Sequence, residues 1–214
     1  MKKENNSTYK LNYIGEEKLK NNDEFFSFYQ GFDGIILNNN MPYFKYSDYE
    51  NYDYFTELDT LGRCREAFAC VCCEKFPSKK RGSIGHVVPS GWKSVKYDCI
   101  SGGYLYNRCH LIAWQLSGQN ANPKNLITGT RYLNVKQMLY FENKIVEYCK
   151  HTENHVLYKV TPKFKANDLV ASGVILEAFS VEDNGVGICF NIYLYNMQPG
   201  IKIDYKTGEN RIAN

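Results

Sequence analysis

"YLYNRCHLIAWQLSGQNANPKNLITGTRYLN", residues 104–134, carries one histidine, two arginines and several carboxamides beside a markedly apolar run. Upstream, "KYDCI" (residues 96–100) and the pair Gly102-Gly103 precede this stretch, so two strands joined at the glycines are expected to form a β-hairpin. His110 then lies at or just past the end of the second strand. The run "HLIAWQLSG" that follows fits a short helix or a continued strand, and "QNANPKN" fits a loop.

Beyond this stretch, "LNVKQMLYFENKIVEYCK" (residues 133–150) has apolar residues at helical spacing. Asn134 is a plausible N-cap, so the pattern predicts a helix from about residue 135 to residue 150. Eight residues separate Asn134 from Glu142, which corresponds to roughly 12 Å of helical rise and roughly 80° of rotation. Both side chains can therefore border one site without binding one ion directly.

The rest of the chain is predicted to form mainly strands. Residues 32–44 indicate a short hairpin or an edge strand, and the alternation in residues 64–73 predicts a strand that buries one face. The strand-like runs after the helix most simply form an antiparallel meander; they are residues 155–164, 169–181, 187–196 and 201–205. Together these elements predict an α+β fold in a single domain, residues 25–214, after a polar and poorly ordered segment, residues 1–24.

The formal net charge of +3 conceals an uneven distribution. Residues 1–60 carry 6 Lys/Arg and 11 Asp/Glu, and the remaining chain carries 20 and 12, for net charges of −5 and +8. The basic part would attract a polyanion, although an ordinary solvated surface explains this balance about equally well. The N-terminus lacks the apolar core of a signal peptide, and no stretch approaches the roughly 18 apolar residues of a membrane span. The protein is therefore expected to act in the cytosol, or to have lost a leader.

Eight cysteines are a high count for this length, and an even number permits disulfides in an oxidising compartment. A zinc site is the less favoured alternative, because "CREAFACVCC" (residues 64–73) lacks paired C-x-x-C spacing. His151 and His155 are the downstream histidines with suitable spacing, and "HTENH" looks like a turn. Unpaired thiols and core packing complete the alternatives.

The residue types in the two stretches fit phosphodiester hydrolysis. A hard cation such as Mg²⁺ prefers oxygen ligands and retains several waters, so one asparagine amide oxygen and a glutamate acting through water suit it. A histidine can take a proton from water near neutral pH, and an arginine can balance phosphoryl charge. Each residue also has an ordinary structural role as a strand-end histidine, a loop or capping asparagine, a solvated glutamate or a surface ion pair.

The joint pattern decides between these readings. "YNRCH", "NPKN", "GTRYLN" and "FEN" follow one another in an arrangement that resembles the DNA/RNA non-specific endonucleases of the ββα-metal (His-Me finger) type. That family has an Asp-Arg-Gly-His signature, an Asn-Pro-Lys-Asn loop and, nine residues later, a magnesium-binding asparagine. The interval from Asn125 to Asn134 is the same nine residues. The resemblance implies a mixed or antiparallel central sheet with flanking helices.

The resemblance also implies roles for individual residues. The general base that activates water falls on His110, and the signature arginine on Arg108. The direct metal ligand falls on Asn134, and the glutamate that holds a metal-bound water on Glu142. Asn125 matches a loop asparagine that supports the site. The implied cofactor is Mg²⁺, or Mn²⁺.

The implied substrates are DNA and RNA, cleaved nearly without sequence preference to products with a 5′-phosphate. Contacts to the nucleic acid are expected from Arg81, in a basic loop, and from Lys124 and Arg131.

Two positions depart from the signature, since Asn107 replaces its aspartate and Cys109 its glycine. The first removes a negative charge beside the site, and the second is expected to put a thiol next to the base. One alternative is therefore a catalytically silent relative that binds nucleic acid. Another is a cytosolic toxin with an immunity protein as its partner. The favoured hypothesis is an active, exported nuclease, because the cysteine count suits an oxidising compartment and an unrestrained cytosolic nuclease is lethal.

Overall fold

The computed structural model describes residues 33–44 and 53–213. Residues 33–214 form one compact unit. The polar segment expected at residues 1–24 lies outside the described residues and stays a prediction. Within the described part of the chain, no helix is long and apolar enough to cross a membrane.

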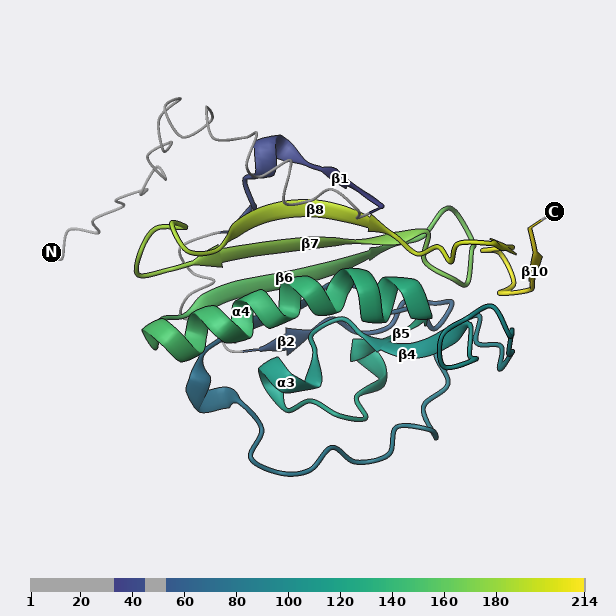
Figure 1. Ribbon diagram of the computed structural model, residues 1–214, viewed down its shortest axis with the longest axis horizontal. Helices are drawn as coiled ribbons and strands as arrows, with labels where there is room; N and C mark the ends of the chain where they lie inside the picture. The colour runs from purple at the N-terminus through teal and green to yellow at the C-terminus, as the bar shows by residue number, and fades with distance from the viewer. Residues whose placement is uncertain (1–32, 45–52, 214) are drawn as a thin grey trace, which may run out of the picture. The chain divides into compact units, whose positions relative to one another are not determined.

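A six-stranded antiparallel sheet is the largest element of the fold (Figure 1). Its strand order is β1-β8-β7-β6-β3-β2. The strands are β1 (Gly34–Ile36), β2 (Tyr54–Phe55), β3 (Ala67–Val71), β6 (Val156–Lys163), β7 (Gly173–Ser180) and β8 (Cys189–Tyr195). Pairing of β6 with β7 and of β7 with β8 confirms the predicted meander over these three strands, and β1 is the predicted edge strand.

The meander does not continue into residues 201–205, so that part of the prediction is wrong. β9 (Ile201–Ile203) pairs instead with β10 (Asn210–Ile212) in a separate two-stranded sheet. The side chain of Asn196, just past β8, donates to the carbonyl oxygens of Thr128 and Ala171. These buried hydrogen bonds hold the end of β8 against other segments, and the chain then turns away from the large sheet.

The prediction that β3 buries one face is also wrong, because all five of its residues are buried. Phe68 and Cys70 pack with Leu157 on one face, under Phe44 and Val181. The other face is covered as well, since α3 (Trp114–Ser117) and α4 (Leu139–Thr152) lie on that side and the thiol of Cys149 approaches the Val71 carbonyl at 3.8 Å. A strand covered on both sides needs no polar face.

The hairpin that carries His110 differs from the predicted one. Only Lys96 and Tyr104 pair across the Gly102-Gly103 turn, as an isolated bridge. The strand β4 (Tyr106–His110) pairs instead with β5 (Leu126–Thr130), which lies beyond the intervening loop. The short helix α3 in that loop confirms one of the two alternatives for residues 110–118, and it ends at Gly118 with a left-handed φ of 68°.

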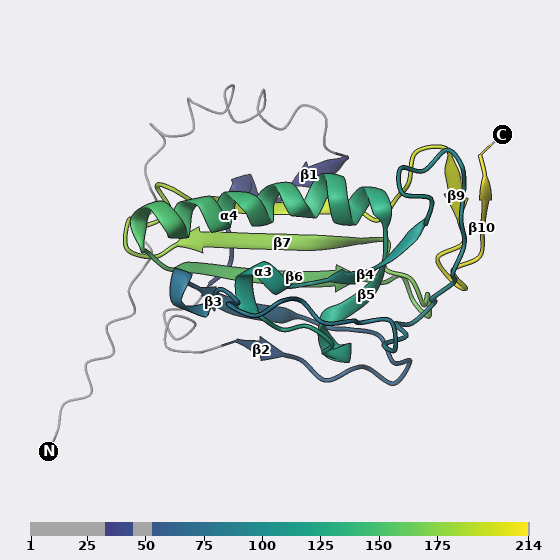
Figure 2. The ribbon, with the colours of Figure 1, turned by 60° about the horizontal axis from the view of Figure 1, so that its bottom comes forward.

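The predicted helix is present, but Asn134 is not its N-cap. Helical structure starts at residue 131, runs through a π-helical segment (Leu133–Met138) and continues as α4. The side chain of Thr130 takes the capping role, because its hydroxyl oxygen accepts from the Leu133 amide at 3.0 Å. Figures 1 and 2 show α4 along one face of the large sheet, where the rings of Phe141 and Phe190 lie 5.1 Å apart.

None of the eight cysteines forms a disulfide. Five of them are buried, and burial raises the pKa of the Cys64, Cys70 and Cys149 thiols to about 12, 11 and 12. These cysteines therefore act as small apolar side chains of the core. The disulfide alternative is not supported.

Candidate active site

The alternation of side chains along β4 divides the site into two sides. Asn107 and Cys109 face the helical segment that begins at residue 131, where they contact Asn134 and Met138. Arg108 and His110 face residues 77–95, called the basic loop below. The two-residue period of the strand therefore places the neighbours of Asn134 on one side of β4 and His110 and Arg108 on the other.

His110 is 6% exposed and both of its ring nitrogens have partners. Its Nε2 lies 2.8 Å from the Asn120 carbonyl oxygen, and its Nδ1 lies 3.2 Å from a guanidinium nitrogen of Arg81. Because a guanidinium only donates, Nδ1 is the acceptor and Nε2 carries the proton. The pKa of His110 is lowered to about 4, chiefly by burial; the Arg81 charge acts in the same direction, and the hydrogen bond to Asn120 opposes both. The ring is therefore neutral at pH 7, with Arg81 covering its basic nitrogen.

Arg108 is a tether for the basic loop. Its guanidinium donates to the carbonyl oxygens of Val87 and Gly85 and stacks on Trp92, with 4.2 Å from Cζ to the ring centroid. These contacts tie the basic loop to β4 at three points. A lysine has neither the planar fork nor the stacking surface that this arrangement uses.

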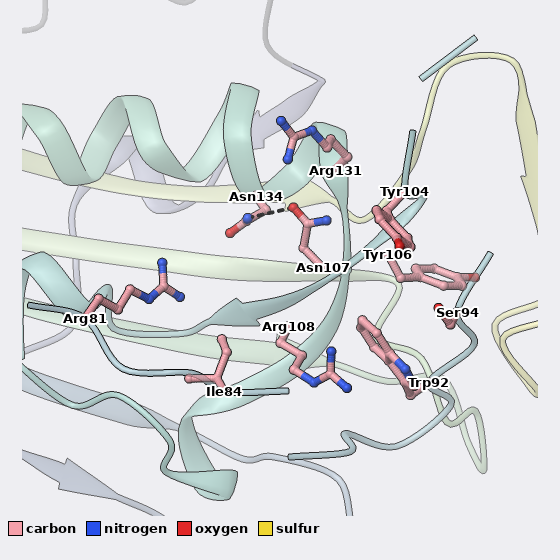
Figure 3. A pocket seen from close by; sticks show the side chains of 10 residues that line it. All are labelled: Arg81, Ile84, Trp92, Ser94, Tyr104, Tyr106, Asn107, Arg108, Arg131 and Asn134. Carbon is pink, nitrogen blue, oxygen red and sulfur yellow. Dashed lines mark hydrogen bonds between the residues drawn. The ribbon is translucent and has the colours of Figure 1, made fainter. Parts of the chain in front are cut away.

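Asn134 and Asn107 form a direct amide–amide contact. The side-chain nitrogen of Asn134 donates to the side-chain oxygen of Asn107 at 3.0 Å. The amide oxygen of Asn134 therefore points the other way, toward Arg81 (Figure 3). The signature aspartate is replaced here by another oxygen acceptor, which orients Asn134 without adding a charge.

Glu142 lies deeper than Asn134, on α4. It is 6% exposed, and burial raises the pKa of its carboxyl group to about 8, while the Arg81 charge acts in the opposite direction. A nearby cation would favour its carboxylate form. The alternative of an ordinary solvated glutamate does not apply to Glu142, because the side chain is buried.

The expected thiol lies next to the backbone of the base, with the Cys109 sulfur 3.7 Å from the His110 carbonyl oxygen, but on the other side of the strand from the imidazole ring. The Cys109 side chain is fully buried, its sulfur lies 3.5 Å from the Met138 sulfur, and burial raises its pKa well above the ordinary range. A Cβ on Gly129 would lie 2.5 Å from the Cys109 Cβ. The absence of a side chain at residue 129 thus leaves room for the larger residue at 109.

Asn125 joins the two ends of the loop between β4 and β5. Its amide oxygen accepts from the Ile112 amide at 2.8 Å and its amide nitrogen donates to the Ile112 carbonyl at 2.9 Å. Asn125 is fully buried, so no water replaces these bonds.

Replacing Asn125 with alanine is expected to lower the free energy of unfolding by about 2–4 kcal/mol, because it leaves two buried backbone groups of Ile112 without partners. Urea unfolding followed by circular dichroism measures this change. Gln119→Ala, an exposed position in the same loop, is the control and is expected to change stability by no more than about 0.5 kcal/mol. Equal stability of the Asn125 variant and wild type would contradict the role given to this side chain.

A pocket of about 510 Å³ brings part of the predicted site together (Figure 3). It is lined by Arg81, Ile84, Trp92, Ser94, Tyr104, Tyr106, Asn107, Arg108, Arg131 and Asn134. This lining contains three arginines and no carboxylate. Of the three predicted nucleic-acid contacts, Arg81 and Arg131 line the pocket, whereas Lys124 forms a 2.5 Å ion pair with Glu57.

Sequence reasoning did not assign a site role to Trp92, Tyr104 or Tyr106. These residues are the aromatic residues of "PSGW" and "YLYNRCH", so their positions beside the motifs could be read from the sequence. Aromatic residues near a motif more often belong to the core, however, and nothing in the sequence distinguished the two roles. Asn107 was identified only as a departure from the signature, and its partner could not be read from spacing.

The donor atoms fit a hard cation better than zinc. In residues 33–44 and 53–213, no group of three or more His, Cys, Asp or Glu side chains is placed to hold a metal ion. His155 pairs with Glu182 at 2.5 Å, and His151 is exposed. The oriented oxygen of Asn134 and the buried carboxyl group of Glu142 are the oxygen donors that Mg²⁺ accepts together with waters.

The model of the family described as DNA/RNA non-specific endonuclease matches residues 42–181, which is more than half of the chain. The chain belongs to this family. It is therefore a nuclease, and the hairpin β4–β5 followed by the helix from residue 131 is the ββα-metal arrangement expected for this endonuclease.

Solved structures of other nucleases resemble this endonuclease over most of its length. NucA from Streptococcus agalactiae, solved with magnesium bound, is 26% identical, with a TM-score of 0.73 over 93% of this chain and 97% of NucA. The Sda1 nuclease, solved with zinc bound, is 27% identical, with a TM-score of 0.63 over 77% of this chain and 81% of Sda1. An extracellular endonuclease at 21% identity and a TM-score of 0.60, covering 86% of this chain and 98% of its own, supports the fold alone.

Proposed function

We propose that this endonuclease hydrolyses phosphodiester bonds of DNA and RNA without sequence specificity, with His110 as general base and Mg²⁺ as cofactor. The observation that carries the proposal is the pocket in which three arginines and no carboxylate surround the oriented amide of Asn134. Such a lining favours the phosphate backbone, which is the same for every sequence. The second support is the neutral, buried His110 directly behind Arg81.

The metal would be held by the amide oxygen of Asn134 and, through water, by Glu142. The bound ion would stabilise negative charge on the phosphoryl group and the leaving oxygen. Asn107 keeps the Asn134 amide in the orientation that presents oxygen to the pocket, as the 3.0 Å contact supports. Mn²⁺, which accepts the same oxygen donors, is expected to replace Mg²⁺.

The proton is proposed to move to Nδ1 of His110. In the structure the guanidinium of Arg81 donates to this nitrogen. When substrate binds, Arg81 must therefore break this hydrogen bond and donate to a phosphate oxygen instead. Attack by water then forms an oxygen–phosphorus bond, and the bond from phosphorus to the 3′ oxygen breaks. The proton of the attacking water goes to Nδ1, the 3′ oxygen takes a proton from solvent, and the product carries a 5′-phosphate. Asn120 keeps the proton on Nε2 throughout.

The remaining predicted residues have supporting roles in this proposal. Arg108 is a positioning residue that keeps the basic loop, and with it Arg81, beside His110. Arg131 binds phosphate at the pocket wall. Lys124 contacts the nucleic acid only after its ion pair with Glu57 opens.

Cleavage of supercoiled plasmid and of folded RNA tests this function. With Mg²⁺ or Mn²⁺ the purified protein is expected to degrade both, and EDTA is expected to abolish degradation. Raising the salt concentration from 50 to about 200 mM is expected to weaken cleavage strongly, because binding releases counterions from phosphates. Intact plasmid and RNA with both metals, together with binding measured in EDTA, would instead favour a silent nucleic-acid-binding relative.

We also propose that the protein is exported. The cysteines give no support for an oxidising compartment, since none of the eight forms a disulfide. The remaining reason is chemical, because an active nuclease without sequence preference would attack the nucleic acids of its own cell. Mass spectrometry of culture medium and washed cells measures the distribution of the chain, and exclusive recovery from the cells would contradict export.

A further inference from the structure

One end of the pocket is lined by aromatic side chains, which phosphate binding does not require. Trp92, Tyr104 and Tyr106 gather there with Ser94, while Asn134 and Arg81 lie at the other end (Figure 3). Aromatic faces beside guanidinium groups are the chemistry that stacks nucleobases along a bound backbone.

The aromatic end is rigid. Tyr106 is 3% exposed, and its hydroxyl donates to the Gly208 carbonyl at 3.0 Å. Trp92 packs against the apolar cluster that includes Tyr106, and Arg108 holds its ring from one side. A preformed aromatic wall can therefore receive a planar group without a large ordering cost.

Tyr104 is the most accessible of these rings. It lines the pocket and is 45% exposed. Lys96, which does not line the pocket, lies over its ring with Nζ 4.6 Å from the centroid. The cation–π contact with Lys96 supports the Tyr104 ring and adds positive charge beside the aromatic end.

Arg131 places a cation beside the aromatic end. Its amide donates to the Leu105 carbonyl at 2.7 Å, and its guanidinium lies against the turn at Gly102, where an added Cβ would be 3.0 Å from Cζ. The backbone beside Tyr104 is thus close to a cation that can hold a phosphate. One pocket thus holds both an exposed ring and a cation, which are the two groups that a nucleotide presents partners for in its base and its phosphate.

Resting on the proposed function, we propose that Tyr104 and Trp92 form a stacking subsite for an unpaired nucleobase next to the cleaved phosphate. The wall offers little for reading base edges, since its neutral polar groups outside the two asparagines are the hydroxyls of Ser94 and the two tyrosines and the indole N–H of Trp92, and the Tyr106 hydroxyl already donates to the Gly208 carbonyl. The subsite therefore accepts any base, but it requires the base to leave a duplex stack. The preferred substrates are single-stranded DNA and RNA, and duplex regions that open easily.

Fluorescence anisotropy in EDTA tests the subsite separately from catalysis. The probes are a short labelled single-stranded oligodeoxynucleotide and an abasic strand of the same length and charge. Wild type is expected to bind the intact strand about 5- to 100-fold more tightly than the abasic strand. Tyr104→Ala is expected to lose most of this difference, and Tyr104→Phe to keep it, because phenylalanine retains the ring.

The matched control is Tyr43→Ala, an exposed tyrosine outside the pocket, which is expected to behave as wild type. Equal affinity of wild type for the intact and abasic strands would overturn the subsite, as would an unchanged preference in Tyr104→Ala. Plasmid cleavage with Mg²⁺ by the same preparations reports the proposed function. A protein that binds the intact strand more tightly than the abasic strand but does not cleave plasmid would refute catalysis and support the subsite. A protein that cleaves plasmid but binds both strands equally would support catalysis and refute the subsite.

Discussion

Replacing His110 with alanine is expected to lower kcat for plasmid cleavage by about 10²–10⁴-fold, because the side chain that accepts the proton of the attacking water is lost. Binding of a single-stranded oligonucleotide in EDTA is expected to change little, since the phosphate contacts come from arginines. The measurement is cleavage under saturating Mg²⁺, with the oligonucleotide affinity determined alongside.

The matched control is His151→Ala at the exposed end of α4, which is expected to keep wild-type activity. A second readout is the acid limb of kcat/KM for wild type. The base works only when neutral and becomes protonated as pH falls through its pKa, which burial and the Arg81 charge lower to about 4. Under saturating Mg²⁺, whose charge favours the carboxylate form of Glu142, activity should therefore persist at pH 5.5, whereas an unperturbed histidine would already be mostly protonated. Undiminished kcat in His110→Ala would remove His110 from the mechanism.

Replacing Asn134 with alanine is expected to lower plasmid cleavage by about 100-fold or more, because the proposed direct ligand of the metal is lost. Asn107→Ala is expected to weaken Mg²⁺ affinity by about 10- to 100-fold while leaving Asn134 in place, since the amide of Asn134 then lacks the partner that orients it. The measurements are the Mg²⁺ concentration for half-maximal cleavage and calorimetric titration of the metal.

Asn107→Asp distinguishes orientation from a general effect of substitution. Aspartate keeps the oxygen acceptor and restores the charge of the family signature, so Mg²⁺ affinity is expected to equal or exceed that of wild type. Asn143→Ala, an exposed carboxamide on α4, is the control for loss of an asparagine near Glu142. Weaker metal binding in Asn107→Asp, or wild-type binding in Asn107→Ala, would contradict the orienting role.

The two departures from the family signature have physical explanations in the packing. Cys109 is accommodated by the missing side chain at Gly129 and by the sulfur of Met138, so it fills the core instead of altering the site. Asn107 retains an acceptor for Asn134. Both substitutions are therefore compatible with an active nuclease.

The sequence by itself determined the local elements and their order. Apolar spacing predicted the helix that contains Glu142, the three strands of the meander and the edge strand. The motif intervals predicted the family. The nine-residue separation between Asn125 and Asn134 can be read from the sequence without knowledge of how the chain packs.

Only the tertiary structure decided which side chains meet across long separations. Arg81 lies on the Nδ1 of His110, and Asn107 reaches Asn134, 27 residues away. The predicted partner of β4 was wrong for the same reason. The Gly-Gly turn indicated a hairpin with residues 96–100, but the sequence did not show that β5, beyond the next loop, pairs with β4 instead. Periodicity records which face of an element is buried, whereas the identity of the group that covers it depends on how distant segments pack. The aromatic wall, the tethered basic loop and the position of Lys124 beside Glu57 all follow from that packing.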